Sequence, residues 1–181
     1  MMKKTVFAGF GGQGVLMMGY AFAMAVMNDG KQITYLPAYG AEMRGGTANC
    51  TVAVSDEEIF SPVSSAPDYA VILNNPSLIK YESMIATGGT LFINSSLVTT
   101  AITRDDISVV KVPAGDMAKK LRNERISNMI MLGAFVSRSQ LTSMESILNA
   151  LAEITKGKKS SLMKSNKKGL DAGADYVLQG A

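Results

Sequence analysis

Short apolar runs alternate along the chain with longer segments whose apolar residues recur at helical spacing. Residues 5–10 form the first apolar run, which ends in glycines, and residues 15–27 follow it. This pattern predicts a strand and then a helix. The helix would carry its small and apolar side chains on one face: Val15, Gly19, Phe22, Ala23 and Val26. Gly30 ends it, because glycine readily takes the left-handed conformation found beyond helix ends.

The same alternation continues through the rest of the sequence. We expect further strands at residues 33–36, 47–54, 69–73, 90–94 and 107–112, and Pro37 closes the first of them. We expect further helices at residues 76–85, 116–121, 126–137 and 167–178. Asn75 stands before Pro76 as a capped helix start. Thr142 and Glu145 have the spacing of a capping box, which predicts one more helix that reaches Ile154.

Regular alternation of strands and helices predicts the fold class. We expect an α/β fold, a three-layer α/β/α sandwich with a mostly parallel, Rossmann-like sheet. The chain has 181 residues, the length of one ordinary domain. We assign residues 1–155 to this α/β domain. Residues 156–181 form a lysine-rich linker and a C-terminal helix that packs on the same domain.

The charge of the chain is unevenly placed. The formal net charge is +3, but residues 156–168 alone hold six lysines and no acidic residue, and the remainder is net acidic. The stretch has no aromatic residue, and a surface for nucleic acid would interleave cations with aromatic side chains. A solvated linker and a contact with an acidic partner surface are the two interpretations that remain.

Two residue types narrow the possible chemistry. Cys50 is the only cysteine, and there is no histidine. One thiolate cannot hold an iron–sulfur cluster, which needs about four. Without histidine, the usual zinc sites and the Ser–His and Cys–His nucleophile pairs are also excluded. We therefore assign no catalytic residue and no metal ligand to this chain.

The length of the apolar stretches indicates whether the chain could span a membrane or be secreted. The longest one, residues 15–27, falls short of the ~20 residues that a membrane span requires. The first residues lack the long apolar core and the small-residue cleavage site of a secretory signal. We expect no membrane span and a cytoplasmic location.

A glycine-rich turn joins the first predicted strand to the first predicted helix. Gly9, Gly11 and Gly14 satisfy the spacing G-x-G-x-x-G in the right context. Glycines there permit a tight turn and let a phosphate approach the helix N-terminus. A dinucleotide is disfavoured, since no acidic residue ends the second strand at 34–37, and a P-loop fails because Val15 follows Gly14. A packing turn, a phosphate site and a contact with a partner's backbone stay open.

A second motif, residues 39–50, follows the second predicted strand. In an open α/β sheet it would emerge on the same rim as the glycine turn. Arg44 offers a planar fork for carboxylate or phosphate, and Glu42 can orient it. Gly45 and Gly46 permit close approach of another backbone. An anion site is one interpretation, and an exposed Glu–Arg pair of little energetic weight is the other.

Several motifs together resemble one protein family. They are Gly9-Phe-Gly-Gly-Gln-Gly-Val15, Tyr39-Gly-Ala-Glu-Met-Arg-Gly-Gly-Thr-Ala-Asn-Cys50, Ser61-Pro62, Asn74 with Pro76, Val112-Pro-Ala114, and Asn128 through Gly133-Ala134. The sequence resembles the gamma subunit of 2-oxoacid:ferredoxin oxidoreductases over residues 4–173. Within that family it is most similar to the branch that handles 2-oxoglutarate or 2-oxoisovalerate. Ala41 is a departure, because the family pattern leads us to expect proline there.

The resemblance implies a multi-subunit enzyme that decarboxylates a 2-oxoacid, passes electrons to ferredoxin and leaves an acyl-coenzyme A. It implies alpha and beta subunits that bind thiamine diphosphate, and a small ferredoxin-like subunit. Thiamine diphosphate and the iron–sulfur cluster would sit chiefly in those partners, so the isolated chain would bind no cofactor and be inactive. The alternative is a stand-alone module that binds a nucleotide or a phosphate metabolite.

The same resemblance, with the two loop motifs, gives the candidate site. It implies a rim that contacts another subunit or faces coenzyme A. The residues of this rim are Gly11, Gly12, Gln13, Gly14, Tyr39, Glu42, Arg44, Gly45, Gly46 and Asn49.

Overall fold

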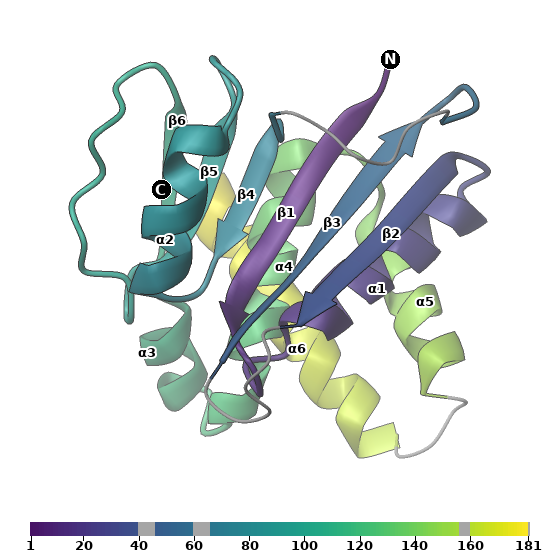
Figure 1. Ribbon diagram of the computed structural model, residues 1–181. Coiled ribbons are helices and arrows are strands. Elements are labelled where there is room, and N and C mark those ends of the chain that lie inside the picture. The colour runs from purple at the N-terminus through teal and green to yellow at the C-terminus, as the bar shows by residue number, and fades with distance from the viewer. Residues whose placement is uncertain (40–45, 60–65, 156–159, 181) are drawn as a thin grey trace.

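A six-stranded sheet lies at the centre of the computed structural model, which describes residues 1–39, 46–59, 66–155 and 160–180 (Figure 1). Its strand order is β2-β3-β1-β4-β5-β6. The strands are β1 (Lys3–Phe10), β2 (Gln32–Tyr39), β3 (Thr47–Ser55), β4 (Tyr69–Ile72), β5 (Thr90–Asn94) and β6 (Ser108–Val112). β1, β4, β5 and β6 pair in parallel, and β3 is antiparallel to both β1 and β2. The predicted mostly parallel α/β sheet is confirmed.

Helices cover both faces of this sheet. One face packs against α1 (Val15–Asn28), α3 (Ala114–Lys120), α4 (Ser127–Ser139), α5 (Met144–Ile154) and α6 (Ser160–Leu178). The other face carries α2 (Asn75–Tyr81), which packs on β1 and β4, and the short 3-10 helix η1 (Glu82–Met84) that follows it. A second 3-10 helix, η2 (Glu124–Ile126), joins α3 to α4. The three-layer arrangement therefore agrees with the sequence prediction.

A cluster of aromatic rings forms the middle of the larger core. Phe135 of α4 is completely buried and meets four rings edge-on, at centroid distances of 5.1–5.7 Å. Its neighbours are Phe7, Phe22, Tyr69 and Phe92, which come from three strands and α1. Edge-to-face pairs of this kind stabilise a core beyond the area that they bury. They fix α4 and α1 against β1, the strand that leads into the glycine turn.

Small residues bring α6 unusually close to α4. A Cβ atom placed on Gly173 would lie 1.9 Å from the carbonyl oxygen of Ile130, and one on Gly133 would lie 2.1 Å from that of Leu170. The two helix backbones are thus in direct contact, which only residues without a side chain allow. Leu170 itself is 1% exposed and belongs to the main core.

Several local predictions need correction. Pro37 does not close β2, which continues to Tyr39; β2 is an edge strand, where proline is tolerated because one side has no neighbouring strand. The N-cap of α2 is Asn74, whose Oδ1 accepts from the Ser77 amide at 2.9 Å. In α5 the cap is Ser143 rather than Thr142, whose hydroxyl instead donates to Asp29.

The lysine-rich region also differs from expectation. We predicted a linker up to a helix at about residue 167, but α6 already begins at Ser160. In its first half, Ser161, Lys164, Lys167 and Lys168 are exposed, whereas the buried positions are taken by Asn166, Gly169 and Leu170. Because the buried side carries few large apolar residues, the hydrophobic periodicity that would predict a helix is weak there.

Candidate functional site

The site predicted from sequence lies at a point where the connections change faces. β1 leads into α1 on one face of the sheet, while its parallel neighbour β4 leads into α2 on the other. Such a switch leaves a crevice at the carboxyl ends of the two strands, which is where open α/β sheets bind ligands. The glycine turn, residues 11–14, forms one wall of this rim.

Two glycines shape the turn. Gly12 and Gly14 have φ values of 94° and 77°, a conformation that other residues rarely adopt. Gly14 is the N-cap of α1 and supplies no side-chain hydrogen bond to the first turn, which also lacks an acidic residue. The free N–H groups and the helix dipole therefore favour an anion at this end of α1.

Gln13 has a structural part in the turn. Its Oε1 accepts from the amide of Phe10 at 2.6 Å, and its Nε2 donates to the carbonyl of Leu73 at 3.5 Å. The side chain thus ties the end of β1 to the end of β4. Asn74, next along the chain, is 3% exposed, and its Nδ2 finds no partner among the described residues. Unsatisfied buried amide groups are uncommon and often mark functional positions.

The second motif meets the glycine turn at the same rim. The amide of Gly11 donates to the carbonyl of Gly46 at 3.0 Å, and Tyr39 pairs with Ala48 in the ladder of β2 and β3. The prediction of a shared rim is thereby confirmed for the ends of the two loops. Asn49 is half-buried in β3, opposite Ala8 of β1. The predicted site residues Glu42, Arg44 and Gly45 lie outside the described residues.

A pocket of about 440 Å³ opens beside the turn. Its lining comes from two distant parts of the chain: Gly12, Gln13, Gly14, Glu124, Arg125, Ser127 and Asn128. Asn128 is 9% exposed, and its Nδ2 would lie 2.2 Å from a Cβ atom on Gly14, so only glycine fits there. Arg125 brings a cation to the anion-favouring end of α1, and Glu124 partly offsets it.

Sequence reasoning missed Arg125 and did not place Asn128 in the site. Both stand more than 100 residues from the glycine turn in the chain. Arg125 has no motif spacing of its own, because it lies in η2 just before a predicted helix start. Asn128 belongs to one of the motifs that carry the family resemblance, and this membership is the signal that could have indicated its place in the site.

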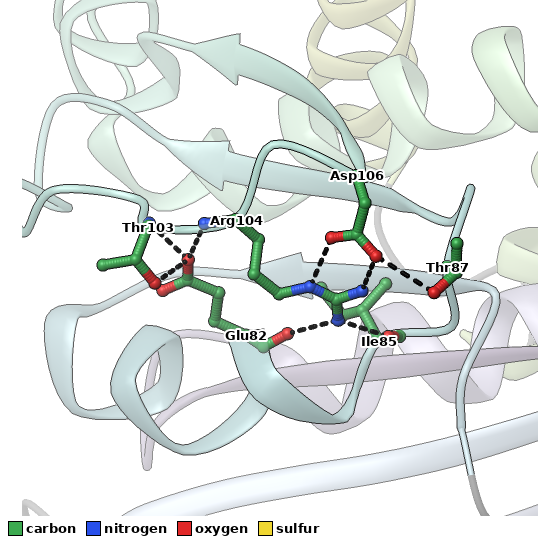
Figure 2. A network of polar contacts seen from close by, with 6 residues as sticks. All are labelled: Glu82, Ile85, Thr87, Thr103, Arg104 and Asp106. Atoms are coloured by element: carbon green, nitrogen blue, oxygen red, sulfur yellow. Dashed lines mark hydrogen bonds and ion pairs between the residues drawn. The ribbon is translucent and has the colours of Figure 1, made fainter.

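A separate network of polar contacts lies at the opposite rim (Figure 2). Arg104 donates to Asp106 at 2.7 Å and to the carbonyls of Glu82 and Ile85, and Asp106 also accepts from Thr87. The hydrogen bond from Arg104, followed by that from Thr87, lowers the pKa of Asp106 to about 2. Since Asp106 precedes β6 at its amino end, the network closes a loop and is no part of the glycine rim.

Glu82 holds the other end of the same loop. Its Oε1 accepts from the amide and hydroxyl of Thr103 and from the amide of Arg104. Burial opposes ionisation of this carboxyl, but the hydrogen bonds together outweigh burial and lower its pKa.

Cys50 is not a reactive thiol. It is completely buried beneath α1, where its Sγ lies 2.2 Å from the position that a Cβ atom on Gly19 would take. Burial raises the pKa of this thiol to about 12. The thiolate is the form that acts as a nucleophile or metal ligand, and a thiol with this pKa stays protonated. Cys50 therefore serves the packing of α1 on β3.

The described residues contain no group of three or more His, Cys, Asp or Glu side chains that could hold a metal ion. Within the same residues, no helix combines the length and apolar character needed to cross a bilayer.

Comparison with known proteins places the chain in a family. Subunit VorA of ketoisovalerate oxidoreductase from Methanothermobacter thermautotrophicus is 36% identical over 176 residues, which are 97% of this chain and 36% of the relative. Subunit KorC of 2-oxoglutarate synthase from Methanothermobacter marburgensis is 31% identical over 191 residues, 99% of either chain. The chain thus spans about a third of the length of its VorA relative and nearly the whole of KorC.

A solved structure shares the whole fold. The gamma subunit of a keto/oxoacid ferredoxin oxidoreductase from Geobacter sulfurreducens superposes with a TM-score of 0.83 at 27% identity, covering 98% of this chain and 99% of that one. The gamma-subunit resemblance seen in the sequence is therefore confirmed. The family model described as pyruvate ferredoxin/flavodoxin oxidoreductase matches residues 4–176, and the chain belongs to that family.

Proposed function

We propose that this chain is the gamma-type subunit of a thiamine-dependent 2-oxoacid:ferredoxin oxidoreductase. The complex oxidatively decarboxylates a 2-oxoacid to an acyl-coenzyme A and passes the electrons to ferredoxin. The observation that carries the proposal is the match over 99% of both chains with a KorC subunit, supported by the fit to a gamma-subunit structure. The substrate belongs to the class of 2-oxoglutarate and branched 2-oxoacids.

Within this complex, the chain supplies no catalytic side chain. It lacks histidine, and its single cysteine is buried with a raised pKa. Thiamine diphosphate and the iron–sulfur cluster reside in alpha and beta subunits and a small ferredoxin-like subunit. The complex works in the cytoplasm. This chain contributes a surface, and the glycine rim is the proposed contact region of that surface.

The rim meets another subunit or coenzyme A. Its proposed residues remain Gly11, Gly12, Gln13, Gly14, Tyr39, Glu42, Arg44, Gly45, Gly46 and Asn49, and the pocket adds Arg125 and Asn128. The elements that lead to and from the rim carry exposed apolar side chains: Phe10 on β1, Leu36 on β2, and Met17 and Tyr20 on α1. Figure 1 shows the face of β1, β3 and β2 that lies opposite α1 without a helix. Exposed apolar surface of this kind supports a subunit contact.

Expression of the chain together with the genes beside its own tests the proposal. A tagged chain should copurify with two thiamine-binding subunits and a ferredoxin-like subunit. The purified complex should reduce ferredoxin with a 2-oxoacid only when coenzyme A is present. A tagged chain that stays alone under these conditions, or a complex without 2-oxoacid turnover, would contradict it.

One observation keeps a second function open. The 440 Å³ pocket at the N-terminus of α1 would also suit a stand-alone module for a nucleotide or phosphate metabolite. Calorimetric titration of the isolated chain with ATP and NADH separates the two. At the glycine turn we expect no saturable site, that is, no binding that Arg125→Gln removes, because the ribose-binding acid and the P-loop lysine are both missing.

A further inference from the structure

A second pocket lies between the turn that follows α3 and the first half of α6. Its volume is about 400 Å³, within the range of small-ligand sites. Its polar lining residues are Arg122, Asn123, Ser161, Lys164, Ser165 and Lys168. It is distinct from the glycine-loop pocket, with which it shares no lining residue.

The spacing along α6 explains how the pocket acquires its charge. Residues three and four positions apart lie on one face of a helix. Ser161, Lys164, Ser165 and Lys168 follow this spacing, so the face that they form is the one turned toward the α3–η2 turn. Two of the six lysines in the predicted linker region, Lys164 and Lys168, thereby line one cavity.

Arg122 is held in an uncommon conformation. Its φ is 55°, and the amides of Arg122 and Asn123 donate to the carbonyls of Lys119 and Ala118 at the end of α3. This is the helix-ending arrangement whose left-handed position usually carries glycine. An arginine there has a conformational cost. Its presence where glycine would be easier points to a role for the guanidinium.

The cations of this pocket are unbalanced. Among the described residues, Arg122, Lys164 and Lys168 form no ion pair. By contrast, Lys167, which does not line the pocket, pairs with Asp171 at 2.6 Å. The lining itself includes no carboxylate. The three cations around this concave surface therefore have no carboxylate partner among the described residues, which favours binding of an anion.

We propose that this pocket binds a small metabolite through one or two phosphate groups. The planar fork of Arg122 matches phosphate oxygens, the two ammonium groups add charge, and the serine hydroxyls can donate. The lining has no aromatic side chain on which the bases of a single-stranded nucleic acid could stack. The concave shape favours a small ligand over a flat protein surface. The proposal does not depend on the function proposed above.

Titration of the full chain with inorganic pyrophosphate tests this site, by calorimetry at about 0.15 M ionic strength. We expect one saturable site per chain. The double variant Arg122→Gly with Lys168→Gln should weaken it about tenfold or more, because two of the three cations are lost. Glycine suits the backbone at residue 122, so this variant should keep its melting temperature and the loss cannot be assigned to unfolding.

Two controls locate the binding. Lys111→Gln with Arg138→Gln removes the same charge from exposed positions outside the pocket and should change the affinity little. Arg125→Gln alters only the glycine-loop pocket and should leave pyrophosphate binding intact. The proposal is overturned if no saturable binding is seen, if both double variants weaken it equally, or if Arg125→Gln abolishes it. Tighter binding of a single-stranded oligonucleotide would overturn the assignment to a small metabolite.

Discussion

At the scale of single residues, the two rims of the sheet use their polar groups differently. At the opposite rim, Arg104 is fully engaged by Asp106 and by two carbonyl oxygens, so the network is closed (Figure 2). At the glycine rim, the amide nitrogen of Asn74 and the first turn of α1 are left without side-chain partners among the described residues. A closed network stabilises a loop, whereas open donors are available for a ligand or a partner.

The closed network predicts a pH dependence of stability. Asp106 has a pKa lowered to about 2, so its contribution is complete above the unfolded value of about 4 and is lost as the pH falls toward 2. We expect Asp106→Asn to lower the melting temperature at pH 7 and to flatten its fall between pH 5 and pH 3. Asp105→Asn, an exposed neighbour, is the control. Identical acid sensitivity of the wild type and Asp106→Asn would show that the network adds nothing.

Arg44 carries the residue-scale prediction for the rim. If it meets an anion of a partner or of coenzyme A, Arg44→Ala leaves that anion unpaired and costs about 2–5 kcal/mol of association. The fold should lose only ~0–1 kcal/mol, the value of an exposed ion pair. We expect an unchanged melting temperature of the isolated chain, with weaker assembly or a raised KM for coenzyme A. Arg138→Ala is the matched control, and a variant that assembles and turns over normally would make the loop structural.

At the scale of elements, the contact between α4 and α6 depends on missing side chains. Gly173 and Gly133 let the backbones touch, and Leu170 then reaches the main core. Helix propensity alone would favour alanine over glycine by about 1 kcal/mol. The close approach opposes this, because a Cβ atom on Gly173 meets backbone atoms that cannot move aside.

We therefore expect Gly173→Ala to destabilise the chain by about 1–3 kcal/mol. Gly169→Ala should cost less, because the nearest atom to its Cβ is a side-chain carbon of Met129 at 3.0 Å. Chemical denaturation of both variants gives the comparison. A stabilised Gly173→Ala variant would mean that propensity prevails and that the helices separate at small cost.

At the scale of the whole molecule, the described residues pack around two core clusters. Both core clusters are apolar, and the described residues hold no candidate metal cluster. In the proposed function, such a chain folds by itself and depends on its partner subunits for catalysis. The exposed apolar residues of α1 and β2 agree with such a dependence.

The corresponding prediction concerns the isolated chain. It should melt cooperatively, bind no iron and show no visible chromophore. It should not reduce a viologen dye with any 2-oxoacid, because histidine is absent and the one thiol is buried. Addition of the partner subunits should restore turnover. Stoichiometric iron or turnover in the isolated chain would refute this division of labour.

Apolar runs predicted most elements because β1, α1, β3 and α4 are largely buried. This pattern failed where tertiary context decides. Pro37 is compatible with β2 only because β2 lies at the edge of the sheet. The start of α6 was obscured by its lysines. For the site, local spacing identified the glycine turn. Arg125 lies more than 100 residues away in the chain and lines the pocket only because the fold brings η2 beside that turn, so no local sequence pattern predicts it.

The packing of α6 on α4 also has a consequence for folding during synthesis. α4 ends at residue 139 and α6 at residue 178, so one face of α4 stays uncovered while about 40 more residues are synthesised. At about 5–20 residues per second, that interval lasts roughly 2–8 s. During it, the face of α4 at Gly133 lacks the backbone contact that α6 later makes at Leu170. In this interval, nascent chains would need shielding from one another at that face.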